Sequence, residues 1–82
     1  MKTIIFACVH NAGRSQMAAA FFNKLTDPQK ARGISAGTEP AKHVHPEVLI
    51  VMKEVGIDLS QAQPTKLTGE LSKSANMIVT MG

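Results

Sequence analysis

Cys8 and Arg14 stand close to the N-terminus at a spacing that suits chemistry on an oxyanion. Five residues separate them, in the order Val-His-Asn-Ala-Gly, and Ser15 follows the arginine. A thiolate is a strong nucleophile, and a guanidinium combines a permanent charge with paired N–H donors that match the oxygens of a tetrahedral anion. The spacing therefore predicts a catalytic pair in which Arg14 holds the anion and Cys8 attacks it.

The residues around this pair predict a loop that surrounds the anion with donors. Backbone N–H groups that converge at the start of a helix bind anions, so we expect an oxyanion site made by Val9, His10, Asn11, Ala12, Gly13, Arg14 and Ser15. The same positive field favours the thiolate form of the cysteine. The alternative, a cysteine that merely fills the core, leaves the arginine and the polar loop unexplained.

Individual loop residues have expected roles. Gly13 allows a backbone conformation that other residues resist, and Asn11 can hold the loop in shape through its amide. Ser15 can either cap the helix or hydrogen-bond the Cys8 sulfur. His10 has two interpretations that stay open: it tunes Cys8, or it is a loop residue with its ring in solvent.

The pattern along the chain places this loop between a strand and a helix. Residues 3–9 form a continuous apolar, β-branched run, which is typical of a strand buried on both faces. The spacing then becomes helical over residues 15–26, with one apolar face made by Met17, Ala18, Phe21, Phe22 and Leu25. A cysteine at the carboxyl end of a parallel strand lies where open α/β sheets bind ligands.

The rest of the chain repeats this alternation. Residues 32–37 predict a second strand, 38–45 a loop, 66–74 one or two helical turns and 76–81 a third strand. Pro46 predicts the start of a helix and Gly56 its left-handed cap, and the inner face consists of Val48, Leu49, Met52 and Val55. We therefore expect a parallel α/β sheet in a single domain over residues 1–82. No further strand or helix follows to cover its far edge, so the expected domain is partial and ends after its third strand.

Composition narrows the class of protein. The chain has 82 residues and a net charge of +3, with its nine Lys and Arg dispersed, and it lacks Trp and Tyr, so nucleic acid is not an expected partner. The single cysteine excludes an intrachain disulfide, and no apolar run is long enough to span a membrane, so we expect a cytoplasmic protein. His43 and His45 lack further ligands nearby, so neither a metal nor a bound cofactor is expected.

The loop resembles the active-site loop of the low-molecular-weight protein tyrosine phosphatase superfamily, and more closely that of its arsenate reductase branch. The residues that carry this resemblance read Cys8-Val9-His10-Asn11-Ala12-Gly13-Arg14-Ser15-Gln16-Met17-Ala18. Segments 35–38, 56–60 and 78–82 are similar to later stretches of the same superfamily. The resemblance implies a three-layer α/β sandwich with strand order 2-1-3, a nucleophilic Cys8 whose thiolate Ser15 favours, an anion held by Arg14 and the loop amides, and a loop braced by Asn11.

The resemblance also implies a reaction, the reduction of arsenate to arsenite through an adduct on Cys8. Because the chain has one cysteine, the second thiol is external: thioredoxin, glutaredoxin or a low-molecular-weight thiol. Arsenate, phosphate or sulfate are the expected anions. Segment 38–45 lacks the aromatic walls of phosphotyrosine phosphatases, and Asp27 and Asp58 do not match their general acid. Two alternatives remain: a phosphatase on small phosphate esters, or a catalytically silent oxyanion binder that completes its sheet as a homo-oligomer.

Overall fold

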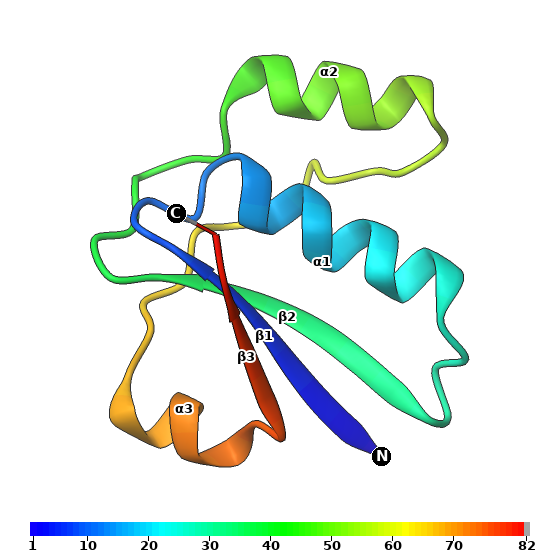
Figure 1. Cartoon of the computed structure of the whole chain (residues 1–82). Coiled ribbons are helices and arrows are strands. Elements are labelled where there is room, and N and C mark those ends of the chain that lie inside the picture. Colours follow the sequence, from blue (N-terminus) through cyan, green and yellow to red (C-terminus); the bar gives the residue numbers. More distant parts are fainter. Residues whose placement is uncertain (82) are drawn as a thin grey trace.

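The computed structural model describes residues 1–81, which form a three-stranded parallel sheet between helices (Figure 1). The strands are β1 (Lys2–Cys8), β2 (Ala31–Gly37) and β3 (Met77–Thr80), in the order β2-β1-β3. Both pairs, β1 with β2 and β1 with β3, are parallel, and Cys8 lies opposite Gly37. The predicted sheet and its strand order are therefore confirmed. Gly82, the last residue of the similar segment 78–82, lies outside the described residues.

Three helices complete the layers: α1 (Arg14–Leu25), α2 (Pro46–Glu54) and α3 (Gly69–Ser74). α1 and α3 lie on opposite faces of the sheet, and α2 packs on the outside of α1 (Figure 1). Val48 and Met52 of α2 are buried, and Met17 and Ala20 of α1 pack against their cluster. The three-layer arrangement follows the expectation, and α2 adds its contacts to the α1 side.

The central strand β1 alternates between these two sides. Ile5 and Ala7, which are 0% and 5% exposed, share a core cluster with Leu71 of α3. Phe6 points to the other face, where its ring centroid lies 5.6 Å from that of Phe22 in α1. Burying a side chain such as Ile5 contributes about 1.5–3 kcal/mol, and β1 is held in this way from both sides. The strand that ends in Cys8 is therefore the most firmly held element of the sheet.

The predicted inner face of α1 is wrong in two places. Phe21 is 40% exposed and Leu25 is 82% exposed, whereas Ser15 and Gln16 in the first turn are buried. Ser15 and Gln16 hydrogen-bond Asn11, so this side of the first turn faces the loop, while Met17 and Ala20 pack against the cluster of α2. In α2, Val55 lies just past the last helical residue and is 45% exposed, while Gly56 has the expected left-handed φ of 83°.

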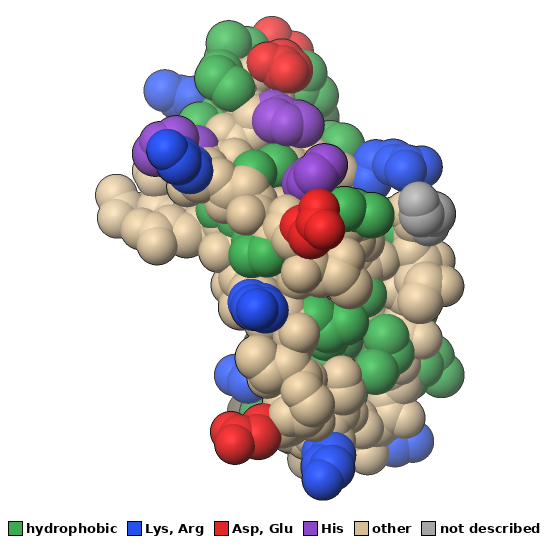
Figure 2. Space-filling model, turned by 90° about the vertical axis from the view of Figure 1, so that its left-hand side faces the viewer, with side chains coloured by type: hydrophobic (Ala, Val, Ile, Leu, Met, Phe, Trp, Pro, Cys, Tyr) green, Lys and Arg blue, Asp and Glu red, His purple; other side chains and the backbone are tan. Residues whose placement is uncertain are grey.

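The surface of the described residues has two further features. β3 is an edge strand, and it exposes Met77, Ile78 and Val79 to between 36% and 57%. Lys and Arg side chains are spread over the face in Figure 2 instead of forming one patch. Among residues 1–81, no helix has both the length and the apolar character that crossing a bilayer requires.

Candidate functional site

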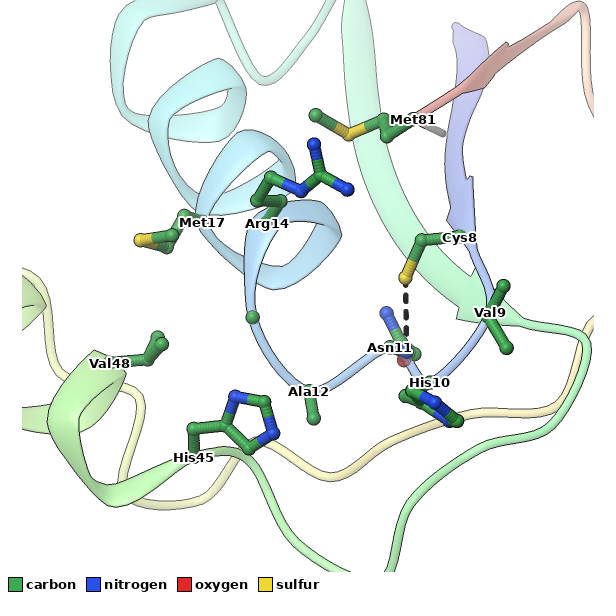
Figure 3. A pocket seen from close by; sticks show the side chains of 11 residues that line it. Cys8, Val9, His10, Asn11, Ala12, Arg14, Met17, His45, Val48 and Met81 are labelled. Atoms are coloured by element: carbon green, nitrogen blue, oxygen red, sulfur yellow. Dashed lines mark hydrogen bonds between the residues drawn. The ribbon is translucent and has the colours of Figure 1, made fainter.

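Cys8 lies at the bottom of a cavity at the carboxyl end of the sheet. It is the last residue of β1, and residues 9–13 connect it to Arg14, the first residue of α1. The cavity has a volume of about 510 Å³ and is lined by the whole segment 8–14 together with Met17, His45, Val48 and Met81 (Figure 3). The cysteine and arginine singled out from their spacing therefore line one cavity.

Two polar groups lie within hydrogen-bond distance of the Cys8 sulfur. The backbone N–H of Asn11 donates to it at 3.0 Å, as the dashed line in Figure 3 marks, and the hydroxyl oxygen of Ser15 lies 2.8 Å away. Hydrogen bonds of this kind stabilise an anionic sulfur more than a neutral one. The other role considered for Ser15 is wrong, because it is the second residue of α1 and the N-cap position belongs to Gly13, without a side-chain cap.

Asn11 shapes the loop through both its backbone conformation and its side-chain hydrogen bonds. It is fully buried and has a φ of 52°, a left-handed conformation that asparagine tolerates better than most residues. Its side-chain Nδ2 donates to Ser15 Oγ at 2.7 Å, and its Oδ1 accepts the backbone N–H of Thr65 at 2.8 Å. The left-handed residue of the loop is therefore Asn11 and not Gly13, whose φ is −139°.

The backbone of the loop is oriented by the segment that follows β2. The carbonyl oxygens of Cys8, Val9, His10 and Ala12 accept backbone N–H groups of residues 38, 39, 41 and 45 at 2.8–3.1 Å. In a trans peptide the N–H points opposite to the C=O, so carbonyls turned outward leave the following N–H groups turned toward the Cys8 side. The N–H of Asn11, which reaches the sulfur, is one of them.

Gly37 lets this loop approach β2 closely. A Cβ at this position would lie 2.5 Å from the carbonyl oxygen of Val9 and 3.0 Å from the Cβ of Asn11. The same glycine donates its N–H to the carbonyl of Thr65 and accepts the N–H of Leu67, both at 2.8 Å. Loop, strand and segment 65–67 therefore meet at one residue that has no side chain.

The start of α1 contributes positive charge. The first N–H groups of a helix have no intrahelical acceptor, and they carry the positive end of the helix dipole. The first turn contains no acidic residue, and the exposed Arg14 projects its guanidinium beside Met81, on the same side of the loop as the Cys8 sulfur (Figure 3). Such an arrangement can bind an anion of tetrahedral shape next to a nucleophilic sulfur.

Two of the three histidines, His10 and His45, line the cavity. His10 is exposed and its Nδ1 lies 3.1 Å from the carbonyl oxygen of Glu39, which favours a role in loop shape over one in tuning the cysteine. His45, which the sequence analysis weighed only as a metal ligand, is also exposed and lines the cavity. His43 lines a different, smaller cavity.

Sequence reasoning also missed residues that contact the loop from a distance. Gln16 and the segment around Thr65 hydrogen-bond Asn11, and Met81 lines the cavity from beyond β3. The burial of Gln16 had a weak signal in its position next to Ser15, on the side of α1 that meets the loop. The contacts of Thr65 and Met81 had none, because they depend on how the chain folds back on the loop.

Comparison with known proteins agrees with this geometry. Residues 3–82 match the family described as low molecular weight phosphotyrosine protein phosphatase. An arsenate reductase of Brevibacillus brevis is 40% identical over 80 residues, which cover 98% of this chain and 58% of the relative. The chain thus spans less than two thirds of the length of that relative.

Solved structures of two activities share the fold. A thioredoxin-dependent arsenate reductase of Corynebacterium glutamicum superposes with a TM-score of 0.92 and 38% identity, covering 100% of this chain and 41% of the other. An arginine phosphatase of Geobacillus stearothermophilus superposes with a TM-score of 0.88 and 29% identity, covering 99% and 53%. The chain belongs to the low molecular weight phosphotyrosine protein phosphatase family.

Proposed function

We propose that the protein takes part in arsenate reduction, with Cys8 as the nucleophile and Arg14 and the loop N–H groups as the oxyanion site. The observation that carries the proposal is the Cys8 sulfur, which lines a cavity at the positive end of α1 and lies within hydrogen-bond distance of the Asn11 N–H and the Ser15 hydroxyl. The kinship with curated arsenate reductases supports arsenate as the substrate. Loop N–H groups and the guanidinium would stabilise the charge on the arsenate oxygens as the sulfur attacks.

The proposed reaction needs two thiols besides Cys8. Attack of the Cys8 thiolate on arsenic, with loss of water, forms a sulfur–arsenic(V) bond. A first thiol then attacks the Cys8 sulfur, arsenite leaves with the electron pair of the sulfur–arsenic bond, and a mixed disulfide remains. A second thiol releases Cys8 and leaves with the first as a disulfide, so arsenic gains the two electrons that the thiols lose. We propose thioredoxin, glutaredoxin or a low-molecular-weight thiol as the donor, because Cys8 is the only cysteine in the chain.

Turnover of arsenate with added thiols tests the proposal. Arsenite should form with the thioredoxin system or with glutathione, and Cys8→Ser should abolish it. Phosphate should slow alkylation of Cys8, since it would occupy the oxyanion site beside the sulfur and block the alkylating reagent. Protection by phosphate without arsenite from any thiol would contradict reduction and leave an oxyanion binder. Absence of both would contradict the site itself.

A phosphatase is the second candidate, since an arginine phosphatase shares the fold and an attack by Cys8 on phosphorus needs the same loop. The described cavity is lined by Met17, Met81, Val48 and two histidines, and no phenylalanine lines it. This lining favours a small oxyanion over an aryl phosphate. Release of phosphate from a small aryl ester, without arsenite from arsenate, would favour the phosphatase.

A further inference from the structure

Gln16 is a buried polar residue beside the site whose side chain touches neither the sulfur nor the cavity. It is 6% exposed, and its Nε2 lies 3.1 Å from both the backbone oxygen and the Oδ1 of Asn11, and 3.2 Å from the carbonyl oxygen of Gln63. Two of these partners are backbone carbonyls, which can only accept, so this end of the side chain must be the NH₂ group.

These contacts determine which way the Asn11 amide points. The backbone N–H of Thr65 donates to Asn11 Oδ1 at 2.8 Å, and a backbone donor cannot reverse its role. Gln16 adds a second donor to the same oxygen. Two donors on one side require the oxygen of the Asn11 amide there, so its NH₂ group faces Ser15, with Nδ2 2.7 Å from Oγ.

The orientation of the Asn11 amide also fixes the direction of the hydrogen bond between Ser15 and the Cys8 sulfur. Because Nδ2 of Asn11 can only donate, Ser15 Oγ accepts, and the single hydroxyl proton of Ser15 is directed at Cys8 Sγ, 2.8 Å away. We propose that Gln16 is a positioning residue that, together with the Thr65 N–H, fixes the direction of this chain so that Ser15 donates to the Cys8 thiolate. A reversed Asn11 amide would face Ser15 with an acceptor and draw the hydroxyl proton away from the sulfur.

The inference deepens the proposed function, since it rests on Cys8 as the nucleophile. Gln16→Met removes the NH₂ donors at similar volume. Gln61→Met makes the same change at an exposed residue whose side chain has no hydrogen bond within residues 1–81. The rate of Cys8 alkylation by iodoacetamide is measured against pH. The midpoint should rise in Gln16→Met, where the Thr65 N–H remains as the one donor to Asn11 Oδ1, and stay unchanged in Gln61→Met. Ser15→Ala should produce a rise of its own, and Gln16→Met in the Ser15→Ala background should add little, because Gln16 acts through Ser15.

Several outcomes would overturn the inference. An unchanged midpoint in Gln16→Met, or additive effects with Ser15→Ala, would show that Gln16 does not act through the hydroxyl. If wild-type Cys8 alkylates like a free thiol and phosphate does not protect it, the proposed function itself fails. If Gln16→Met does not fold, hydrogen exchange in the wild type decides. The side-chain NH₂ groups of Gln16 and Asn11 should exchange far more slowly than that of Gln61, and equal rates would refute the inference.

Discussion

The hydroxyl oxygen of Ser15 lies 2.8 Å from the sulfur of Cys8, although the two residues stand seven positions apart. Cys8 ends the central strand of the sheet, and Ser15 lies in the first turn of α1, so each is held by a rigid element. The five-residue loop between these elements therefore determines the contact. Variants that change the loop without unfolding the sheet should separate the geometry of the site from the stability of the domain.

Ser15→Ala should slow alkylation of Cys8 at pH 6.5 about tenfold or more, because a hydrogen bond to a charged group is worth about 1.5–3 kcal/mol. Urea unfolding should also shift, by about 1–3 kcal/mol, because the buried Nδ2 of Asn11 loses its acceptor. Ser72→Ala, in α3 and with no side-chain hydrogen bond, is the control and should alkylate like the wild type. Equal rates for Ser15→Ala and the wild type would show that the hydroxyl does not stabilise the thiolate.

Asn11 combines a left-handed backbone with a bonded amide, and two substitutions separate these features. Asn11→Ala should lose stability on both counts, by about 2–4 kcal/mol. Asn11→Gly removes the backbone strain and should recover about 1 kcal/mol of that loss in urea unfolding. Both variants should lose fast alkylation, since Ser15 loses its partner in each. If Asn11→Gly alkylates at the wild-type rate, the reactivity of Cys8 depends on the backbone conformation at position 11 and not on the Asn11 amide.

Gly37→Ala should destabilise the protein by about 1–3 kcal/mol, because the added Cβ meets the carbonyl oxygen of Val9 at 2.5 Å and backbone must move. The shift would also disturb the loop that carries Asn11, so phosphate protection of Cys8 should weaken. Gly69→Ala is a matched control with nothing within 4 Å of the added Cβ, and it should be neutral or slightly stabilising. Thermal unfolding of the two variants provides the comparison.

Arg14→Lys keeps the charge and removes the paired donors of the guanidinium. Binding of phosphate or arsenate, followed by protection of Cys8, should weaken about tenfold. The pH profile of alkylation in the absence of anion should barely move, since both hydrogen bonds to the sulfur come from other residues. Arg32→Lys on β2, exposed and away from the cavity, should bind like the wild type. If Arg14→Lys binds the anion as tightly as the wild type, the paired donors of the guanidinium do not contribute to anion binding.

Asp58 provides a pH test outside the site. Hydrogen bonds from the side chain and backbone of Ser60 hold the pKa of the Asp58 carboxyl below its usual value of 3.8, so the folded state favours the ionised form. A lowered folded pKa stabilises the protein above the unfolded pKa, and this contribution is lost as the pH falls through the folded pKa. Asp58→Asn should therefore flatten the dependence of unfolding on pH below about 4. An unchanged slope would show that the turn is formed without the charge.

The sequence predicted those parts of the molecule that depend on local patterns. The strand that ends at Cys8, the helix after Gly13, the start at Pro46 and the cap at Gly56 all follow from period, proline and glycine. The exposure of Leu25 could not be predicted from the period alone, because it depends on which sides of α1 the sheet, the loop and α2 cover. Contacts between Asn11 and Thr65, 54 positions apart, require the folded chain.

The central position of β1 has a consequence for partial opening of the molecule. Strands at the edges of a sheet fray first, and amide hydrogens of a strand paired on both sides exchange last. β2 and β3 flank residues Ile4–Ala7 of β1, so Cys8, which pairs with Gly37 of β2, directly follows the stretch of backbone that opens last. Transient fraying of the edge strand β3 would therefore displace Met81 from the cavity wall before it displaces the Cys8 sulfur. Reactivity toward small reagents should consequently survive conditions that already loosen the walls of the cavity.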